Sequence, residues 1–295
     1  MITGVSGFLG SHLLKFLLAT TNYKFVAIKR ETSNLFRLLD IDSTRVEFFD
    51  VSNDFNDLED AFKDKNILSI IHCATNYGKK GESCVDILHT NLIFPIKLLE
   101  LAIKYNVESF INTDSYFNKP QMSYQYLQNY SLSKKSLLLW LKLYSEKIKI
   151  ANVVLEHIYG PQDNLSKFVP FLINEIAKKN SSSVDLTGGE QKRDFIYIDD
   201  VVKAYKYILD FTLNKYLKFK QFNIGTGKAY SIKELACEIK KQSKSSTKLN
   251  FGALPYRVDE IMISQADNSE MKNIGWEAEY DLRKGIGEYI KYVQK

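Results

Sequence analysis

The sequence predicts an α/β protein built on a doubly wound parallel sheet, with a smaller lobe in its C-terminal half. The chain has 295 residues, of which 45% are hydrophobic and 25% are charged, so it can bury a sizeable core. Apolar strands alternate with helix-forming segments, which is typical of a parallel sheet covered on both faces. A glycine-rich turn at residues 3–10 connects the first strand to the first helix.

The strands of the first half are predicted from short apolar runs that end in polar or turn-forming residues. The first comprises residues 1–3, whereas a buried strand usually has about five residues. Either this strand is short or the natural chain begins earlier. The other strands are expected at residues 25–28, 46–49, 67–72, 109–113 and 150–155. Residues 1–155 are therefore predicted to form the sheet-bearing core.

The second half alternates between helices and strands without a clear linker. Helices are expected at residues 161–179 and 233–244. Strands are expected at residues 195–198 and 222–224, and either could return to the central sheet. Residues 156–295 should therefore form mainly a second lobe, which sends segments back to the core.

The glycine-rich turn has the spacing of a loop that binds a dinucleotide. Gly4 permits the tight turn out of the first strand, Gly7 lets backbone amides approach a pyrophosphate, and Gly10 lets the next helix pack on the sheet. A strand, a helix and a second strand complete the expected unit, which disfavours an ordinary glycine turn. Phe8 and Leu9 lie in the same loop, so all five residues are predicted to bind the cofactor.

Tyr130 and Lys134 form a candidate proton-donating pair. Residues four apart project from the same side of a helix, so the ammonium can lie near the phenol and lower its pKa from about 10. Such a phenol can donate a proton in hydride chemistry. This spacing arises easily by chance in a chain with 18 tyrosines. Together with the dinucleotide loop, however, it indicates an oxidoreductase.

These two motifs resemble the extended short-chain dehydrogenase/reductase family, which includes the NAD-dependent epimerases, dehydratases and ketoreductases of nucleotide sugars. The resemblance covers nearly the whole chain, because further segments similar to the family follow in the expected order. These segments are residues 70–74, 91–100, 110–115, 159–161 and 193–201. The resemblance implies a Rossmann core, a lobe that binds a nucleotide sugar, and a homodimer.

The resemblance also implies which residues surround the cofactor. In the family, the cofactor passes over the end of the fourth strand, and an aspartate after the third strand lies near the adenine. Asp50 matches that aspartate, although an aspartate at a strand end is also a common turn former. The implied contacts besides the glycine turn, Tyr130 and Lys134 are Asp50, Val51, Cys73, Ala74, Thr75, Asn91 and His157.

The end of the second strand indicates which nicotinamide cofactor is bound. NAD enzymes place an acidic side chain there to bind the ribose 2′-hydroxyl. This chain instead has Lys29 and Arg30, followed by Ser33 and Asn34. These residues favour the 2′-phosphate of NADP, with NAD as the alternative. The alternative is that Lys29 and Arg30 have no binding role and are simply two solvated cations at the end of a strand.

The resemblance implies a third catalytic residue, a hydroxyl on the fifth strand. The register counted from Val107 and Phe110 assigns the family's Ser or Thr to Ser115, whereas the similarity of residues 111–114 to dehydratases would select Thr113. Ser115 is preferred because its register also covers the loop before the strand. Either hydroxyl could donate a hydrogen bond to a substrate carbonyl, and local turn chemistry is the alternative for both.

A dehydratase is disfavoured by the residues that follow this hydroxyl. In the sugar 4,6-dehydratases of the family, an Asp and a Glu directly follow the catalytic Thr and act as acid and base. Here Ser115 is followed by Tyr116 and Phe117, and Thr113 is followed by Asp114. The acid and base pair is incomplete in both registers, so elimination of water lacks its base.

Three segments, residues 111–117, 130–135 and 155–161, are most similar to the bacterial CDP-abequose and CDP-paratose synthases. This similarity implies NADPH-dependent reduction of a CDP-4-keto-3,6-dideoxyhexose for bacterial surface polysaccharide. The rivals in the same class are an NAD-dependent 4-epimerase and a reductase of a dTDP- or GDP-linked 4-keto-6-deoxy sugar. A rival from another class is a cofactor-binding regulator without turnover, which the intact catalytic residues disfavour.

Recognition of the diphosphate is expected from two arginines of the C-terminal half. Arg193 and Arg257 match family arginines that clamp a nucleotide diphosphate by forked, charge-assisted hydrogen bonds. Ion pairs with neighbouring acidic residues are the structural alternative for both. His157 stands where many relatives carry an Asn that contacts substrate. The implied substrate contacts are Thr75, Ser115, Tyr116, His157, Asn164, Phe168, Arg193 and Arg257.

Composition and charge disfavour several other classes of protein. The net charge is +5, and the lysines are scattered rather than clustered with aromatic residues, which disfavours a nucleic-acid surface. No apolar run is long enough to span a bilayer, and the four histidines fit no metal-ligand spacing. The three cysteines are odd in number and unpaired by spacing, which indicates a reducing cytoplasm.

Overall fold

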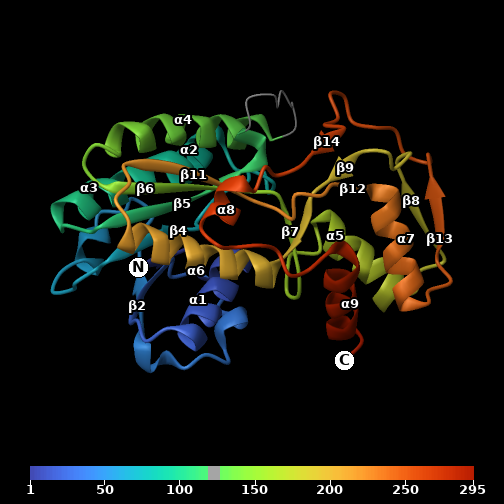
Figure 1. Cartoon of the computed structure of the whole chain (residues 1–295), viewed down its shortest axis with the longest axis horizontal. Coiled ribbons are helices and arrows are strands. Elements are labelled where there is room, and N and C mark those ends of the chain that lie inside the picture. The colour runs from blue at the N-terminus through green and yellow to red at the C-terminus, as the bar shows by residue number, and fades with distance from the viewer. Residues whose placement is uncertain (119–126) are drawn as a thin grey trace. The chain divides into compact units, whose positions relative to one another are not determined.

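The structure, a computed structural model, describes residues 1–118 and 127–295. The chain forms two compact units (Figure 1). Of the described residues, unit 1 contains 1–118, 127–154 and 202–222, and unit 2 contains 155–201 and 223–295. Unit 1 therefore combines the first half of the chain with one later segment.

A seven-stranded sheet forms the centre of unit 1. Its strands are β1 (Ile2–Thr3), β2 (Phe25–Lys29), β3 (Val46–Asp50), β4 (Ser69–His72), β5 (Ser109–Ser115), β6 (Lys149–Leu155) and β11 (Phe219–Ile224). They lie in the order β11-β6-β5-β4-β1-β2-β3, and the pairs β2–β3, β1–β2, β1–β4 and β4–β5 are parallel. The doubly wound parallel sheet predicted from the sequence is confirmed.

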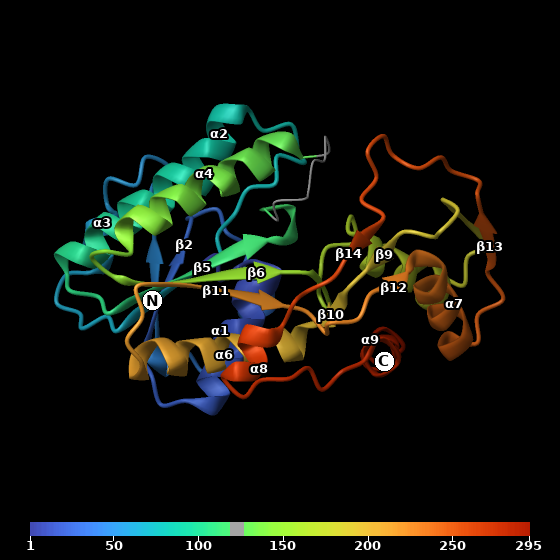
Figure 2. The same cartoon turned by 45° about the horizontal axis from the view of Figure 1, so that its top comes forward.

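Helices cover both faces of this sheet (Figure 2). On one face lie α1 (Phe8–Thr20) and α6 (Ile198–Asn214). On the other lie α2 (Cys84–Leu88), a π-helical turn (His89–Ile93), α3 (Phe94–Lys104) and α4 (Gln128–Tyr144). Short 3₁₀ turns occur at Phe36–Leu38, Ser43–Arg45, Leu58–Ala61 and Tyr116–Asn118.

The first strand is short but is held on both sides. Ile2 and Thr3 pair in register with β2 and with β4. The Thr3 hydroxyl oxygen also accepts hydrogen bonds from the backbone N–H groups of Cys73 and Ala74, both at 3.2 Å. These contacts hold the glycine turn against the end of β4, where the cofactor residues were predicted.

The position of α4 in the core explains why two of the predicted catalytic residues are buried. Leu137 and Leu141 of α4 and Phe110 of β5 are fully buried in one apolar cluster. Burying a side chain of this size stabilises the fold by about 1.5–3 kcal/mol. Tyr130 and Lys134 continue the same helical stripe, at spacings of three and four residues. The apolar anchoring of α4 therefore carries both into the interior.

Unit 2 is built from small sheets and helices. β7 (His157–Tyr159) pairs with β10 (Phe195–Tyr197), and β8 (Ser183–Leu186) pairs with β13 (Lys248–Phe251). β9 (Lys192–Arg193) lies between β12 (Tyr230–Ser231) and β14 (Ile263–Ser264). The helices are α5 (Phe168–Leu172) with a π-helical turn (Ile173–Lys178), α7 (Ile232–Ser243), α8 (Ser269–Asn273) and α9 (Leu282–Val293).

The second half differs from the sequence-based expectation in two places. Residues 222–224 lie in β11 of the central sheet, but Phe195–Tyr197 forms β10, which pairs with β7 within unit 2. The helix expected at residues 161–179 begins only at Phe168. Gln162 has φ +64°, in the left-handed region, so the chain cannot be helical there.

Candidate active site

Two close backbone approaches shape the glycine turn between β1 and α1. Gly4 has φ +70°, and a Cβ atom at this position would lie 2.7 Å from the backbone nitrogen of Ala74. A Cβ atom at Gly10 would lie 2.3 Å from the carbonyl oxygen of Gly4. Any larger residue at either position would push the turn, the helix and the end of β4 apart.

The start of α1 offers backbone donors to an anion. Gly7 is the N-cap and supplies no side-chain cap, and the first turn contains no acidic residue. The backbone N–H groups at a helix start point toward its N-terminal end, and the helix dipole favours negative charge there. The turn formed by Gly4, Gly7, Phe8, Leu9 and Gly10 therefore fits the pyrophosphate of a dinucleotide.

Asn91 holds the loop after β4 against α4. Its Oδ1 accepts hydrogen bonds from Thr75 Oγ1 at 3.2 Å and from Asn76 N at 2.7 Å. Its Nδ2 donates to Asn76 O at 2.8 Å and to Ser133 Oγ at 3.0 Å. Asn91 is fully buried, and the protein itself uses its hydrogen-bonding capacity. In this structure, Asn91 acts by positioning the loop that contains residues 73–75.

Tyr130 and Lys134 are both buried, with 3% of each residue exposed. Lys134 Nζ donates a hydrogen bond to the carbonyl oxygen of Thr113 at 2.8 Å. The ring of Tyr77 stacks on that of Tyr130, with 4.8 Å between the ring centroids. Burial raises the pKa of Tyr130 well above its usual value and lowers the pKa of Lys134. The expected lowering of the Tyr130 pKa is wrong for this structure, because burial disfavours the ionised phenol.

The two candidate hydroxyls on β5 have different partners. The Ser115 side chain holds down the pKa of Tyr130, against the rise that burial causes. Thr113 Oγ1 instead lies 2.7 Å from the hydroxyl of Tyr205 on α6. Of the two hydroxyls, Ser115 is the one that acts on the pKa of Tyr130.

A buried polar network on β5 and β6 was missed from the sequence. The Asp114 carboxylate accepts hydrogen bonds from Ser115 N at 2.8 Å, and from Asn118 Nδ2 and Asn152 Nδ2, each at 2.9 Å. Asn152 Oδ1 accepts from Asn112 Nδ2 at 2.7 Å. Polar residues inside otherwise apolar strands were the available signal, because burying them is costly without a specific role.

The ends of β2 and β3 carry the residues predicted to select the cofactor. Lys29 forms an ion pair with Asp50, its partner in the β2–β3 register, so its charge is already matched. Arg30 is exposed. Arg37 was missed from the sequence, and its Nη1 donates to the carbonyl oxygen of Ser6 in the glycine turn at 3.1 Å. The structure therefore adds a second arginine at this end of the glycine turn.

In unit 2, Arg193 is 7% exposed at the end of β9. Its Nη2 forms an ion pair with Glu260, and its Nη1 donates to the carbonyl oxygen of Lys192 at 2.8 Å. Glu260 N in turn donates to the carbonyl oxygen of Arg257 at 3.2 Å. A single turn thus connects the two arginines that were predicted to clamp a diphosphate.

Asp194 holds the junction between β9 and β10. Its buried carboxylate accepts hydrogen bonds from the backbone nitrogens of Thr226 at 2.8 Å, Gly227 at 2.9 Å and Ala266 at 3.1 Å. Burial raises the pKa of Asp194. His157 N donates to the carbonyl oxygen of Asp194 at 3.1 Å, so this junction also fixes β7 beside Arg193.

The remaining predicted substrate residues of unit 2 are less closely grouped. His157 Nδ1 lies 3.5 Å from the Glu156 carboxylate, and burial lowers the pKa of His157. Asn164 is exposed in the turn before α5, and Phe168 is 40% exposed at the first position of α5. Unit 2 therefore brings His157 and Arg193 together, whereas Asn164 and Phe168 belong to a separate segment.

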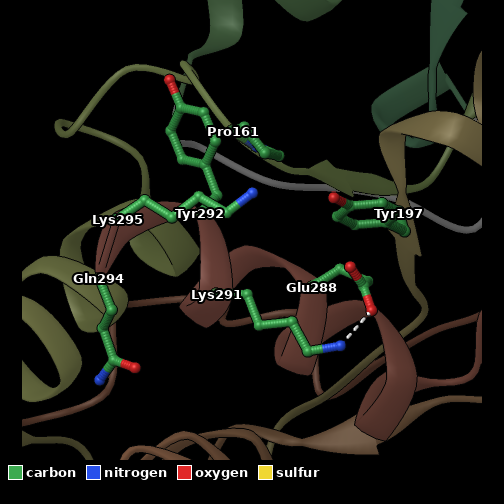
Figure 3. A pocket seen from close by; sticks show the side chains of 7 residues that line it. All are labelled: Pro161, Tyr197, Glu288, Lys291, Tyr292, Gln294 and Lys295. Atoms are coloured by element: carbon green, nitrogen blue, oxygen red, sulfur yellow. Dashed lines mark hydrogen bonds and ion pairs between the residues drawn. The ribbon is translucent and has the colours of Figure 1, made fainter.

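A surface pocket of about 470 Å³ lies beside the C-terminal helix of unit 2. Figure 3 shows its lining, in which Glu288 and Lys291 of α9 form an ion pair. The lining residues are Pro161, Tyr197, Glu288, Lys291, Tyr292, Gln294 and Lys295. None of the predicted site residues is among them, so this pocket is not the candidate active site.

The part of the chain that the structure describes contains no group of three or more His, Cys, Asp or Glu that could hold a metal ion. No helix among those residues is long and apolar enough to cross a membrane. Cys73, Cys84 and Cys237 are all free.

Comparisons with known proteins give a consistent result. Residues 1–225 match the NAD dependent epimerase/dehydratase family. The chain is 38% identical over 296 residues to a CDP-abequose synthase of Salmonella typhimurium. The match covers 99% of this chain and 97% of the relative.

Solved structures share the fold at lower identity. The UDP-glucose 4-epimerase of Thermotoga maritima, solved with UDP-glucose, has a TM-score of 0.85 at 22% identity, over 99% of this chain and 97% of that one. The UDP-glucose 4-epimerase of Thermus thermophilus, in complex with NAD, has a TM-score of 0.83 at 20% identity, over 99% of this chain and 98% of that one. These likenesses establish the architecture of the chain.

Proposed function

The chain belongs to the NAD dependent epimerase/dehydratase family, and on that premise we propose that it is an NADPH-dependent 4-ketoreductase of a nucleotide sugar. The proposed product is a CDP-3,6-dideoxyhexose of the abequose or paratose type, used for bacterial surface polysaccharide. The observation that carries this proposal is the 38% identity to a CDP-abequose synthase over 99% of the chain. The buried Tyr130, Lys134 and Ser115 supply the chemistry that such a reduction needs.

In the proposed reaction, bound NADPH supplies a hydride to the carbonyl carbon C4. Ser115 donates a hydrogen bond to the carbonyl oxygen as negative charge develops on it. Tyr130 transfers its phenolic proton to that oxygen, so the carbonyl becomes a hydroxyl. Lys134 stabilises the resulting tyrosinate by its positive charge. Hydride and proton together account for the two-electron reduction.

The burial of Tyr130 supports its role as the acid. A phenol that loses contact with water keeps its proton, because its ionised form is poorly solvated. Tyr130 therefore remains a proton donor at neutral pH. Ionisation of Tyr130 becomes favourable when its proton has a developing alkoxide to go to and the Lys134 ammonium lies nearby. The site therefore keeps Tyr130 protonated before the reaction and stabilises its ionised form only in the transition state.

The preference for NADP(H) is proposed from the arginines near the glycine turn. Arg30 is exposed beside the end of β2, and Arg37 is anchored to the turn through the carbonyl oxygen of Ser6. Guanidinium groups bind phosphate by forked, charge-assisted hydrogen bonds. Lys29 has a smaller part in this proposal, because Asp50 already pairs with it.

Binding of the diphosphate is proposed for Arg193 and Arg257. Both lie in unit 2, and the turn at Glu260 links them. The Glu260 carboxylate and the carbonyl oxygen of Lys192 hold the Arg193 guanidinium, so it is oriented before a ligand arrives. A pre-oriented guanidinium loses little side-chain entropy on binding, which favours affinity.

An assay with three substrates tests the proposal. With NADPH, a CDP-4-keto-3,6-dideoxyhexose should be reduced at a higher kcat/KM than a dTDP- or GDP-linked 4-keto-6-deoxy sugar, and cofactor should be consumed in equal measure with substrate. If none of the three oxidises NADPH while a 4-hydroxy nucleotide sugar is interconverted with no net cofactor change, the chain is an epimerase. The epimerase is the second candidate because solved epimerases share the fold.

We propose further that the enzyme is a cytoplasmic homodimer. Helix α4 exposes an apolar stripe of Leu132, Leu139 and Leu143, which are 62%, 69% and 64% exposed, with Trp140 beside it at 41%. A contiguous apolar stripe on a helix favours burial against a second copy by two-fold symmetry. Light scattering should give twice the chain mass, and the pair Leu139→Glu and Leu143→Glu should give the monomer. The three free cysteines are consistent with a reducing compartment.

A further inference from the structure

Among the side chains that the structure describes in unit 1, one carboxylate and one ammonium are buried. Among its described residues, Asp114 is the only buried Asp or Glu, and Lys134 is the only buried Lys or Arg. They are 4% and 3% exposed. Lys134 Nζ binds the carbonyl oxygen of Thr113, the residue directly before Asp114. The two charges are therefore neighbours in a region that otherwise excludes charge.

The surroundings of Asp114 match a carboxylate that carries its charge. Its hydrogen-bond partners Ser115 N, Asn118 Nδ2 and Asn152 Nδ2 are all donors. An ionised carboxylate only accepts hydrogen bonds, so this set satisfies it without a proton of its own. The described residues include no direct ion pair of Asp114 with Lys134, so the two interact through space.

Four other titratable groups near this pair, the side chains of His72, Cys73, Tyr130 and Tyr205, are neutral at physiological pH. Burial lowers the pKa of His72 and raises the pKa of the Cys73 thiol to about 11. Burial also raises the pKa values of Tyr130 on α4 and Tyr205 on α6 well above the usual range. Two further phenols, Tyr77 and Tyr116, also contribute to the electrostatic environment of Tyr130. Asp114 and Lys134 thus supply the fixed charges on which the electrostatics of the site depend.

We propose that Asp114 is a positioning residue, whose buried carboxylate is the counter-charge that keeps Lys134 an ammonium and Tyr130 a phenol. A lone ammonium in this interior would be costly, and a nearby anion offsets that cost. The same negative charge disfavours a tyrosinate, so the proton stays on Tyr130 until substrate takes it. This role rests on the proposed reduction, in which Tyr130 is the acid and Lys134 its partner.

The first test is the pH dependence of kcat in Asp114→Asn, assayed with NADPH and the keto sugar. Removing the carboxylate charge lowers the pKa values of both Tyr130 and Lys134, so the alkaline limb should move to lower pH by about one unit. Asn152→Ser is the matched control, because it removes a hydrogen bond to Asp114 and leaves the charge. Its alkaline limb should coincide with that of the wild type. An unmoved limb in folded Asp114→Asn would overturn the proposal.

The second test does not depend on turnover. Asp114→Asn and Lys134→Met each leave one buried charge without its counter-charge, whereas the double variant leaves neither. The melting temperature of the double variant should therefore exceed that of Lys134→Met alone. A double variant that melts below Lys134→Met would overturn the proposal, and this comparison holds even if Asp114→Asn alone does not fold. If the melting temperatures of the single and double variants show that Asp114 and Lys134 stabilise each other but no keto sugar is reduced, the proposed function fails and the counter-charge role stands.

Discussion

The guanidinium of Arg193 on β9 forms an ion pair with the carboxylate of Glu260, in the turn that also contains Arg257. The two side chains are 9% and 13% exposed, so both charges are largely withdrawn from water. A phosphate group would compete with Glu260 for the same forked donors. Without substrate, Glu260 therefore occupies the Arg193 guanidinium, which is proposed to bind the diphosphate.

We expect Glu260→Gln to lower the KM for the nucleotide sugar by about threefold or more, because a neutral amide competes less well than a carboxylate for the guanidinium. The dissociation constant of NADPH, measured by titration calorimetry, should not change. Glu288→Gln, which removes an exposed carboxylate of α9, is the control. An increase in KM in Glu260→Gln would instead show that the ion pair orients Arg193 for binding.

Tyr130→Phe should lower kcat by about 10²- to 10⁴-fold, the usual contribution of a general acid. The substitution removes only the phenolic oxygen, so packing against Tyr77 and the affinity for NADPH should be retained. Stopped-flow measurement of NADPH oxidation checks the rate, and fluorescence titration checks binding. A wild-type rate in this variant would exclude Tyr130 as the acid.

The activity of the wild-type enzyme should persist through neutral pH and fall only at alkaline pH. An acid works in its protonated form, so activity is present below its pKa and is lost as the pH rises through that pKa. Burial raises the pKa of Tyr130, which moves this loss to higher pH. The dependence of kcat on pH between 6 and 10 is the measurement, and an alkaline limb near pH 7 would contradict it.

Ser115→Ala should reduce kcat more than Thr113→Val. The Ser115 side chain acts on the pKa of Tyr130, whereas the Thr113 hydroxyl pairs with that of Tyr205. Loss of one hydrogen bond to a developing oxyanion typically costs about 10²- to 10³-fold in kcat. Parallel steady-state assays of the two variants decide between the registers, and a larger loss in Thr113→Val would favour the other register.

The preference for NADPH over NADH should depend more on Arg30 than on Lys29. A phosphate contact by an arginine contributes about 1.5–3 kcal/mol, so Arg30→Ala should reduce the ratio of affinities by about tenfold or more. Lys29→Ala should have a smaller effect, because Lys29 is already paired with Asp50. Titration with both reduced cofactors measures the ratios. Tighter binding of NADH by the wild type would remove the basis of this prediction.

Sequence patterns were sufficient for the parts of the fold that depend on local spacing. The strands β2 to β6 lie where apolar runs ended in turn-forming residues, and α1 follows the glycine turn as expected. Such patterns do not choose between partners of similar strand propensity. The sequence therefore left open the observed pairing, in which residues 222–224 lie in the central sheet and Phe195–Tyr197 pairs with β7 in unit 2.

For the candidate site, the sequence by itself determined which chemical groups are present: a glycine turn for a dinucleotide, and the hydroxyl, phenol and ammonium of Ser115, Tyr130 and Lys134. The tertiary structure decided their electrostatic state. Tyr130 and Lys134 are buried because α4 is anchored by Leu137 and Leu141, and burial raises the pKa of the phenol, against the direction expected from helix spacing alone. Spacing along a helix specifies which residues share a face, but only packing determines how much water reaches them, and water sets the cost of a charge.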